Sequence, residues 1–257
     1  MQGISRVAVG GATGRVGRHI VDVLNERGYG VVPIARANGV DVITGQGLAE
    51  VLQGVDCIID ASTGPSAEEQ PATEFFTTAT RNLQTLGQQA GVQRLVTVSI
   101  IGCDRFTGGY GAAKIAHERA VLGGPIPGRV LRAAQFHEFV SQLMAWGTRG
   151  DVCYVQEMRT QLVAARTVAE GLVDLAISAN GFSVARIPEI GGPREESMVE
   201  AAKLLAARRA GGLRIEGVVD TSDPDHAVYT SGALLPAPYA TLAGPTFEAW
   251  LATQAAD

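Results

Sequence analysis

Tyr110 and Lys114 are the two residues of this chain whose types and spacing most directly allow acid–base chemistry. They stand four positions apart, so on a helix they share one face about a turn apart. A lysine ammonium beside a phenol favours the phenolate and lowers the pKa of the tyrosine, which makes it a usable general acid near neutral pH. Ser99 ends an upstream apolar run, 94–99, where its hydroxyl can hydrogen-bond a carbonyl oxygen that is being reduced. The pattern predicts a Tyr–Lys proton donor assisted by a serine.

A glycine-rich segment near the N-terminus predicts a binding site for a dinucleotide. Gly11, Gly14 and Gly17 follow a GxxGxxG spacing between the apolar run 7–9 and an apolar helical pattern. This spacing allows a tight turn, close approach of the backbone to a pyrophosphate and close packing of helix on strand. The helix start adds free N–H groups and the positive end of the helix dipole. The residues expected at the phosphates are Gly11, Ala12, Thr13, Gly14, Arg15, Val16 and Gly17.

The residues after the second expected strand favour NADP as the cofactor. Arg36 follows this strand, and no acidic residue stands at the strand end, where NAD-selective sites hold the ribose hydroxyls. An arginine at this position can pair with a 2′-phosphate instead. Arg15 could add a second positive contact from within the glycine turn. Ala61 and Ser62, which follow the expected strand 56–60, are also expected to bind the cofactor.

Alternating strand and helix patterns predict a doubly wound parallel α/β sheet, the Rossmann fold. Strands are expected at 6–10, 30–35, 40–43, 56–60, 94–99 and 128–132, and helices at 15–27, 47–53, 72–90 and 110–122. Further on, helices are expected at 135–147, 167–178, 198–209 and 246–253, with extended pieces at 151–155, 160–164, 182–185 and 213–216. We expect one domain over 1–257, in which the small, irregular part 133–257 contributes the substrate-side elements.

Composition and charge exclude several classes of protein. A net charge of −5 provides no basic surface for nucleic acid or an anionic membrane. No stretch reaches the roughly 20 apolar residues of a membrane span. Three widely separated cysteines argue against a disulfide framework and for a reducing cytoplasm, and no signal peptide is expected. His137-Glu138 lacks the second histidine of an HExxH zinc motif, so no metal is expected. We expect a cytoplasmic protein with a small-molecule substrate, and a homodimer is compatible with the sequence.

Several of these motifs together resemble the short-chain dehydrogenase/reductase superfamily, and more closely its atypical NmrA-like branch of NAD(P)H-binding proteins. The resemblance covers most of the chain and rests on 11–17, 91–99 and 110–114, with support from 131–136. It implies that Ser99 polarises the substrate oxygen, that Tyr110 donates the proton, and that Lys114 holds the nicotinamide ribose while tuning Tyr110.

The same resemblance assigns further residues and marks departures from the family pattern. Asn82 matches a family asparagine, and Gln46 stands where the family often has an aspartate that contacts adenine. Gln46 could still hydrogen-bond the base amine. The stretch from Ser99 to Tyr110 is slightly shorter than usual and contains Gly108-Gly109, which predicts either a mobile loop or a displaced Tyr110.

The expected function is NADPH-dependent hydride transfer to a small carbonyl or enone substrate. Gln135, Phe136 and His137 are expected to line its pocket, whereas His19 and His117 are expected at the surface or boundary of helices. One alternative is a non-catalytic NAD(P)-sensing regulatory protein of NmrA-like type, whose mark would be an intact glycine turn with the tyrosine or lysine lost. Another is epimerase or dehydratase chemistry on a nucleotide sugar with bound NAD. The presence of both the tyrosine and the lysine favours the reductase over the sensor, whereas the weak case for an NAD-selecting acid and the small C-terminal part argue against the epimerase.

Overall fold

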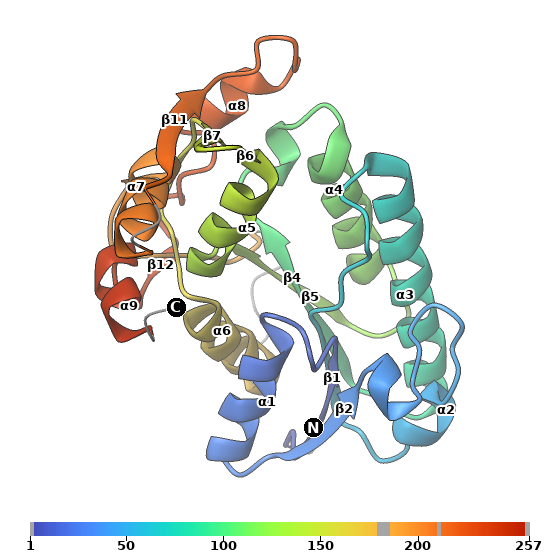
Figure 1. Ribbon diagram of the computed structural model, residues 1–257. Coiled ribbons are helices and arrows are strands. Elements are labelled where there is room, and N and C mark those ends of the chain that lie inside the picture. The colour runs from blue at the N-terminus through green and yellow to red at the C-terminus, as the bar shows by residue number, and fades with distance from the viewer. Residues whose placement is uncertain (1–2, 179–185, 210–211, 255–257) are drawn as a thin grey trace.

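A parallel sheet forms the centre of the computed structural model, which describes residues 3–178, 186–209 and 212–254. Its seven strands lie in the order β12-β9-β5-β4-β3-β1-β2, and the neighbouring strands pair in parallel. They are β1 (Arg6–Gly10), β2 (Gly30–Ile34), β3 (Cys57–Asp60), β4 (Arg94–Ile100), β5 (Gly128–Ala133), β9 (Glu189–Gly191) and β12 (Thr241–Leu242). The predicted doubly wound Rossmann-type sheet is confirmed (Figure 1).

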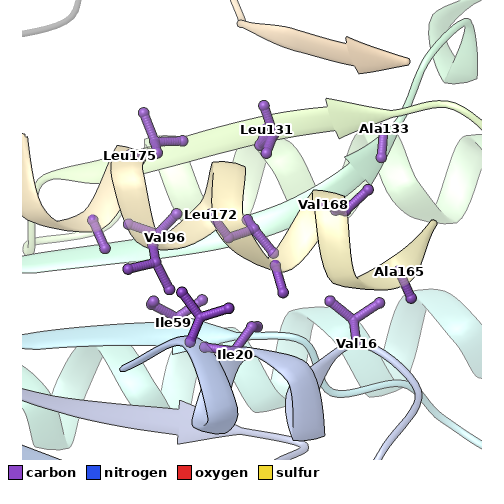
Figure 2. Packing of buried hydrophobic residues seen from close by; sticks show 14 of the residues in the cluster. Val16, Ile20, Ile59, Val96, Leu131, Ala133, Ala165, Val168, Leu172 and Leu175 are labelled. Carbon is purple, nitrogen blue, oxygen red and sulfur yellow. The ribbon is translucent and has the colours of Figure 1, made fainter. Parts of the chain in front are cut away.

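Helices cover both faces of the sheet because its strands are apolar on both sides. Val7 and Val9 of β1 pack into the core beneath α1 and α6, whereas Ala8 between them packs into the core beneath α3 and α4. Figure 2 shows the first of these cores, where Ile20 and Leu172 meet the sheet. The helices are α1 (Gly17–Glu26), α2 (Leu48–Val51), α3 (Glu69–Gln89), α4 (Gly109–Leu122) and α6 (Ala165–Ile177), and the short 3-10 helices are η1 (Arg36–Asn38) and η2 (Cys103–Arg105).

The C-terminal part of the chain adds a separate hydrophobic core beside the sheet (Figure 1). Its helices are α5 (His137–Gly147), α7 (Met198–Arg208), α8 (His226–Thr230) and α9 (Phe247–Thr253). Two small sheets complete it: β6 (Thr148–Arg149), β7 (Val152–Gln156) and β11 (Arg214–Val218) form one, and β8 (Arg159–Thr160) and β10 (Glu196–Ser197) form the other. No helix among the described residues is both long and apolar enough to cross a membrane.

The strand expected at 40–43 does not form. The Asp41 carboxylate accepts hydrogen bonds from the N–H groups of Ile43 and Thr44, and Gly45 N–H donates to the Asp41 carbonyl. Val40 and Val42 are buried, as they would be in a strand, but the local turn takes the backbone groups that a strand would use. β2 therefore ends the sheet on this side. The extended piece expected at 182–185 lies outside the described residues.

Candidate active site

The glycine turn between β1 and α1 has the geometry that its spacing predicts. Gly11 has φ +66°, and a Cβ there would lie 2.8 Å from the carbonyl oxygen of Ala61. A Cβ on Gly17 would lie 2.0 Å from the carbonyl oxygen of Gly11, so the helix can begin here only with glycine. Gly14 N–H donates to the same oxygen at 2.8 Å and closes the turn. A side chain at Gly11 or Gly17 would therefore collide with neighbouring backbone atoms, and only glycine fits at these two positions.

The turn leaves backbone donors for an anion. Arg18 N–H donates to the Gly14 carbonyl at 3.2 Å, but within the described part of the chain the N–H groups of Thr13, Arg15, Val16 and Gly17 have no hydrogen-bond acceptor. Unpaired N–H groups at the start of a helix, together with the helix dipole, form an anion-binding site. The turn therefore fits the pyrophosphate of a dinucleotide.

The residues predicted around the adenosine half are exposed. Arg36 lies in η1, directly after β2, and Gln46 lies in the turn before α2. Arg15 takes a different direction, because its Nη2 donates to Gln142 Oε1 of α5 at 2.9 Å. Asn82 has a structural contact in this region: its Nδ2 donates to the carbonyl oxygens of residues 42 and 43, at 2.9 and 2.8 Å. The Asn82 side chain therefore fixes the loop that carries Gln46.

The segment after β3 connects the glycine turn to Tyr110. Ala61 N–H donates to the Gly10 carbonyl at 3.0 Å, and Ser62 lies against Gly11. One residue further, Thr63 Oγ1 lies 3.4 Å from the Tyr110 hydroxyl. The predicted proton donor and the predicted phosphate turn therefore meet through three consecutive residues, 61–63.

Tyr110 and Lys114 share a helix face as predicted, and both contact the ring of Phe76 on α3. The Tyr110 ring meets the Phe76 ring edge-on at 5.9 Å between centroids, and Lys114 Nζ lies 4.4 Å from the Phe76 centroid. Burial raises the pKa of Tyr110, while the hydrogen bond with Thr63 acts in the opposite direction. The predicted lowering of the Tyr110 pKa by Lys114 is wrong, because burial raises this pKa and, among the described residues, the only group that acts to lower it is Thr63.

Lys114 itself is buried, with 5% of its surface exposed. Its Nζ donates to the Val98 carbonyl at 2.8 Å and contacts His117 Nδ1 at 2.9 Å. Burial lowers the pKa of Lys114 to about 8, although the carboxylates of Asp60 and Glu118 act to raise it. An amine with this pKa can change charge within the ordinary working range of an enzyme.

His117 is not at the surface or boundary of its helix, which corrects the expectation from sequence. It is 1% exposed, and its ring stacks on Phe76 at 4.6 Å with an interplanar angle of 9°. Burial lowers the pKa of His117 well below its ordinary value, and the neighbouring Lys114 charge adds to the effect. The imidazole is therefore neutral at physiological pH.

Ser99 lies in a different network from Tyr110. It is 2% exposed, and its Oγ lies 3.7 Å from the Sγ of Cys103. Cys103 Sγ donates to Glu118 Oε1 at 3.3 Å, and Arg132 binds both oxygens of that carboxylate at 2.9 and 2.8 Å. No hydrogen bond among the described residues joins Ser99 to Tyr110, whose hydroxyl is paired with Thr63 instead.

The loop before Tyr110, expected to be mobile, is held by two carboxylates. Asp225, at the start of α8, accepts from Thr107 N and Oγ1 at 2.8 and 2.9 Å and from Gly108 N at 3.3 Å. Glu69 of α3 accepts from Gly109 N at 2.8 Å. Negative charges at the N-terminus of α4 also complement its dipole. The C-terminal part of the chain thereby fixes the start of the helix that carries Tyr110.

The predicted substrate residues, 135–137, contact the C-terminal part. Gln135 Oε1 accepts a hydrogen bond from Thr160, and Phe136 forms a bridge with Val163. His137 is 1% exposed; its Nε2 lies 3.1 Å from the Pro245 carbonyl, and its ring centroid lies 5.5 and 5.2 Å from those of Phe247 and Trp250. Burial lowers the pKa of His137 to about 4. These contacts place its ring among aromatic side chains of α9. In the described parts of the chain, no group of three or more His, Cys, Asp or Glu residues could hold a metal ion.

Part of the chain is similar in sequence to known proteins. Residues 11–122 match a family model described as NAD(P)H-binding. A 158-residue stretch is 30% identical to a 3-beta-hydroxysteroid dehydrogenase of Mycolicibacterium neoaurum, covering 47% of this chain and 43% of that protein. Residues 11–122 therefore match an NAD(P)H-binding domain, and this match together with the Rossmann-type sheet supports the resemblance to the atypical, NmrA-like branch of the short-chain dehydrogenases/reductases.

Solved structures share the fold over nearly the whole chain. MoeE5 in complex with UDP-glucose and NAD superposes with a TM-score of 0.71 at 20% identity, covering 97% of each chain. The dTDP-4-dehydrorhamnose reductase of Bacillus anthracis str. Ames, in complex with NADP, gives 0.69 at 19% identity and covers 97% of this chain and 98% of its own. One of these two structures holds NAD and the other NADP, and the family model that matches residues 11–122 is described as NAD(P)H-binding.

Sequence reasoning missed three residues that the structure places around the Tyr–Lys pair, namely Thr63, His117 and Asp225. A signal existed for two of them. Thr63 closely follows a buried strand at the edge where parallel sheets bind ligands, and His117 lies three positions after Lys114, on the same helix face. Asp225 is 118 residues from Thr107, and no local pattern links them.

Proposed function

We propose that this chain is an NADPH-dependent oxidoreductase that transfers hydride to a small carbonyl or enone substrate, with Tyr110 as the proton donor. The observation that carries the proposal is the hydrogen bond between the Tyr110 hydroxyl and Thr63, because residues 61 and 62 contact the glycine turn. This contact supports a role for Tyr110 as a proton donor beside the site that fits a dinucleotide.

The cofactor, when bound, supplies the hydride. The residues of this chain would bind and orient the cofactor, and one of them would supply a proton to the substrate. The N–H groups of 13 and 15–17 hold the phosphates, and Lys114 provides a positive charge for the ribose next to the nicotinamide. Tyr110, whose pKa is raised by burial, stays protonated across the neutral range and can donate its proton to the substrate oxygen. Because Ser99 is turned toward Cys103, Thr63 is the hydroxyl available to position the Tyr110 proton.

Replacing Arg36 should change which cofactor is preferred. Arg36 is exposed directly after β2, where a guanidinium can pair with a 2′-phosphate. We expect Arg36→Glu to weaken NADPH binding by about tenfold or more while leaving NADH binding within about twofold, since a charged pair is replaced by repulsion. Fluorescence titration with both cofactors measures this, with Arg18→Glu as an exposed control on α1. Equal losses for NADPH and NADH would contradict the assignment.

The function itself is tested by NADPH oxidation on a panel of small aldehydes, ketones, enones and quinones. A 3β-hydroxysteroid with NADP⁺ is added because of the curated relative. Turnover of at least one carbonyl or enone that depends on Tyr110 supports the proposal. Binding of oxidised and reduced cofactor with equal affinity and no turnover favours the non-catalytic NAD(P) sensor, and turnover of nucleotide sugars without net NADPH consumption favours an epimerase.

A further inference from the structure

A chain of hydrogen bonds runs from Lys114 through His117 into the sheet. Lys114 Nζ lies 2.9 Å from His117 Nδ1, and His117 Nε2 lies 3.4 Å from Thr97 Oγ1. Thr97 Oγ1 donates to the carbonyl oxygen of Asp60 at 2.9 Å. Lys114, His117 and Thr97 are all buried. This series of hydrogen bonds therefore ends at Asp60, the last residue of β3, directly before the segment 61–63 that contacts both the glycine turn and Tyr110.

The direction of each hydrogen bond in this chain is fixed by chemistry. An ammonium group only donates, so Nδ1 of His117 must be the unprotonated acceptor. The neutral imidazole then carries its proton on Nε2, which donates to Thr97 Oγ1, and the Thr97 hydroxyl is left to donate to the Asp60 carbonyl. A second proton on His117 would place an N–H opposite the ammonium. The arrangement is consistent only for a neutral His117 in the Nε2–H form.

We propose that His117 is a positioning residue for Lys114: its neutral imidazole accepts a hydrogen bond at Nδ1 and holds the ammonium, charged, beside the cofactor site. The role of Lys114 at the cofactor rests on the proposed function. The contact between Lys114 Nζ and His117 Nδ1 is independent of that function. The other fixed partners of the ammonium are the Val98 carbonyl and the face of Phe76. His117 is the partner whose acceptor can be removed by substitution without altering the backbone.

The charged groups around Lys114 come from three elements. Asp60 lies at the end of β3, Cys103 in η2 and Glu118 on α4 itself, and each acts to raise the pKa of the ammonium against the larger effect of burial. Glu118 is already bound by two nitrogens of Arg132, Nε and Nη2, and the burial of Asp60 raises the pKa of its carboxyl. The carboxyl groups of Glu118 and Asp60 therefore stabilise the Lys114 ammonium less than free carboxylates would. The hydrogen bond that His117 Nδ1 accepts adds to their effect.

The chain offers a clean measurement of this contact, because Lys114 and Lys203 are its two lysines. Protein labelled with ¹³C at lysine Cε gives two side-chain signals, and exposed Lys203 serves as the internal reference. We expect the Lys114 signal of the wild type to titrate with a pKa of about 8. His117→Leu should lower that pKa by about one pH unit or more, the size expected for losing a hydrogen bond to a charged group.

Two amide variants separate the two ring nitrogens. Asparagine places an amide oxygen near the position of Nδ1, whereas glutamine reaches the position of Nε2. Both lose the stacking on Phe76, so they share any general cost of removing the ring. We expect His117→Asn to keep the pKa of Lys114 within about half a pH unit of the wild type and His117→Gln to resemble His117→Leu. Equal values for the wild type and His117→Leu, or for asparagine and glutamine, would overturn the proposal.

A measurement on the wild-type protein keeps the test valid if a variant fails to fold. The ¹⁵N chemical shifts of the imidazole of His117 report its tautomer and charge directly. The proposal requires the neutral Nε2–H form throughout pH 6 to 9; a protonated ring or the Nδ1–H form in that range contradicts it.

Enzyme assays separate this inference from the proposed function. The pH profile of kcat/KM should fall above about pH 8, where Lys114 loses its charge, and the fall should move to lower pH in His117→Leu and return in His117→Asn. If Lys114→Met retains full turnover, the proposed role of the lysine fails, while the lysine titration still decides whether His117 holds it. If the titration shows no effect of His117 but Lys114→Met is inactive, the function stands and this inference fails.

Discussion

Replacing Tyr110 with phenylalanine should lower kcat by about 100-fold or more while leaving the affinity for NADPH within about twofold, because a positioned general acid contributes roughly 10² to 10⁴ in rate. The ring keeps its edge-on contact with Phe76, so the substitution removes the hydroxyl and little else. The hydrogen bond to Thr63 is long at 3.4 Å, so its loss should change stability only slightly. The loss is therefore expected in turnover rather than in folding.

The control for this variant is Tyr154→Phe, which removes the hydroxyl of a tyrosine that is 42% exposed on β7. Both variants are assayed with whichever substrate the carbonyl and enone panel identifies, and NADPH binding is measured by fluorescence. Full activity of Tyr110→Phe would remove the tyrosine from the mechanism. Equal loss in both variants would point to a general effect of hydroxyl removal.

Gly17→Ala should have the second large effect, on both cofactor binding and stability. The added methyl would lie 2.0 Å from the Gly11 carbonyl oxygen and within 3.0 Å of Ala12 Cα, and both are backbone atoms with little freedom to move. We expect NADPH affinity to fall by more than about tenfold and the free energy of unfolding to fall by about 1–3 kcal/mol, the usual cost of overpacking. Urea unfolding and cofactor titration measure the two effects.

Gly30→Ala is the matched control for that variant. It lies on β2 of the same sheet, and a Cβ there meets no atom closer than 3.4 Å. It should change both quantities by little. If Gly17→Ala binds NADPH as tightly as the wild type, the dinucleotide does not lie on the turn before α1.

The local parts of the site were predictable from sequence because their causes are local. The spacing of Gly11, Gly14 and Gly17 determines a turn whatever the rest of the chain does, and four-residue spacing places Tyr110 and Lys114 on one face of any helix. The parallel sheet was predictable for the same reason, since short apolar strands that alternate with amphipathic helices bury their side chains most readily in a sheet covered by helices.

The electrostatics of the pair were not predictable from that spacing. Burial raises the pKa of Tyr110, and the ring of Phe76 on α3, far from both residues in sequence, contacts Tyr110 and Lys114. The same ring stacks on His117 and keeps it out of solvent. At 40–43 the local turn at Asp41 replaces the expected strand, and the Asn82 side chain on α3 also binds the carbonyl groups of residues 42 and 43. In each case a distant helix contributes contacts to the outcome.

The central claim is that the dinucleotide on the glycine turn places its nicotinamide beside Tyr110, and it can be tested without knowing the substrate. The measurement is the intermolecular nuclear Overhauser effect between the nicotinamide C4 protons of bound NADPH and the tyrosine rings of a protein that is deuterated except at tyrosine. Tyr110→Phe identifies the Tyr110 signals. We expect strong effects to the Tyr110 ring that disappear in the variant; bound NADPH with effects only to other tyrosines, or with none, would show that the nicotinamide does not lie beside Tyr110.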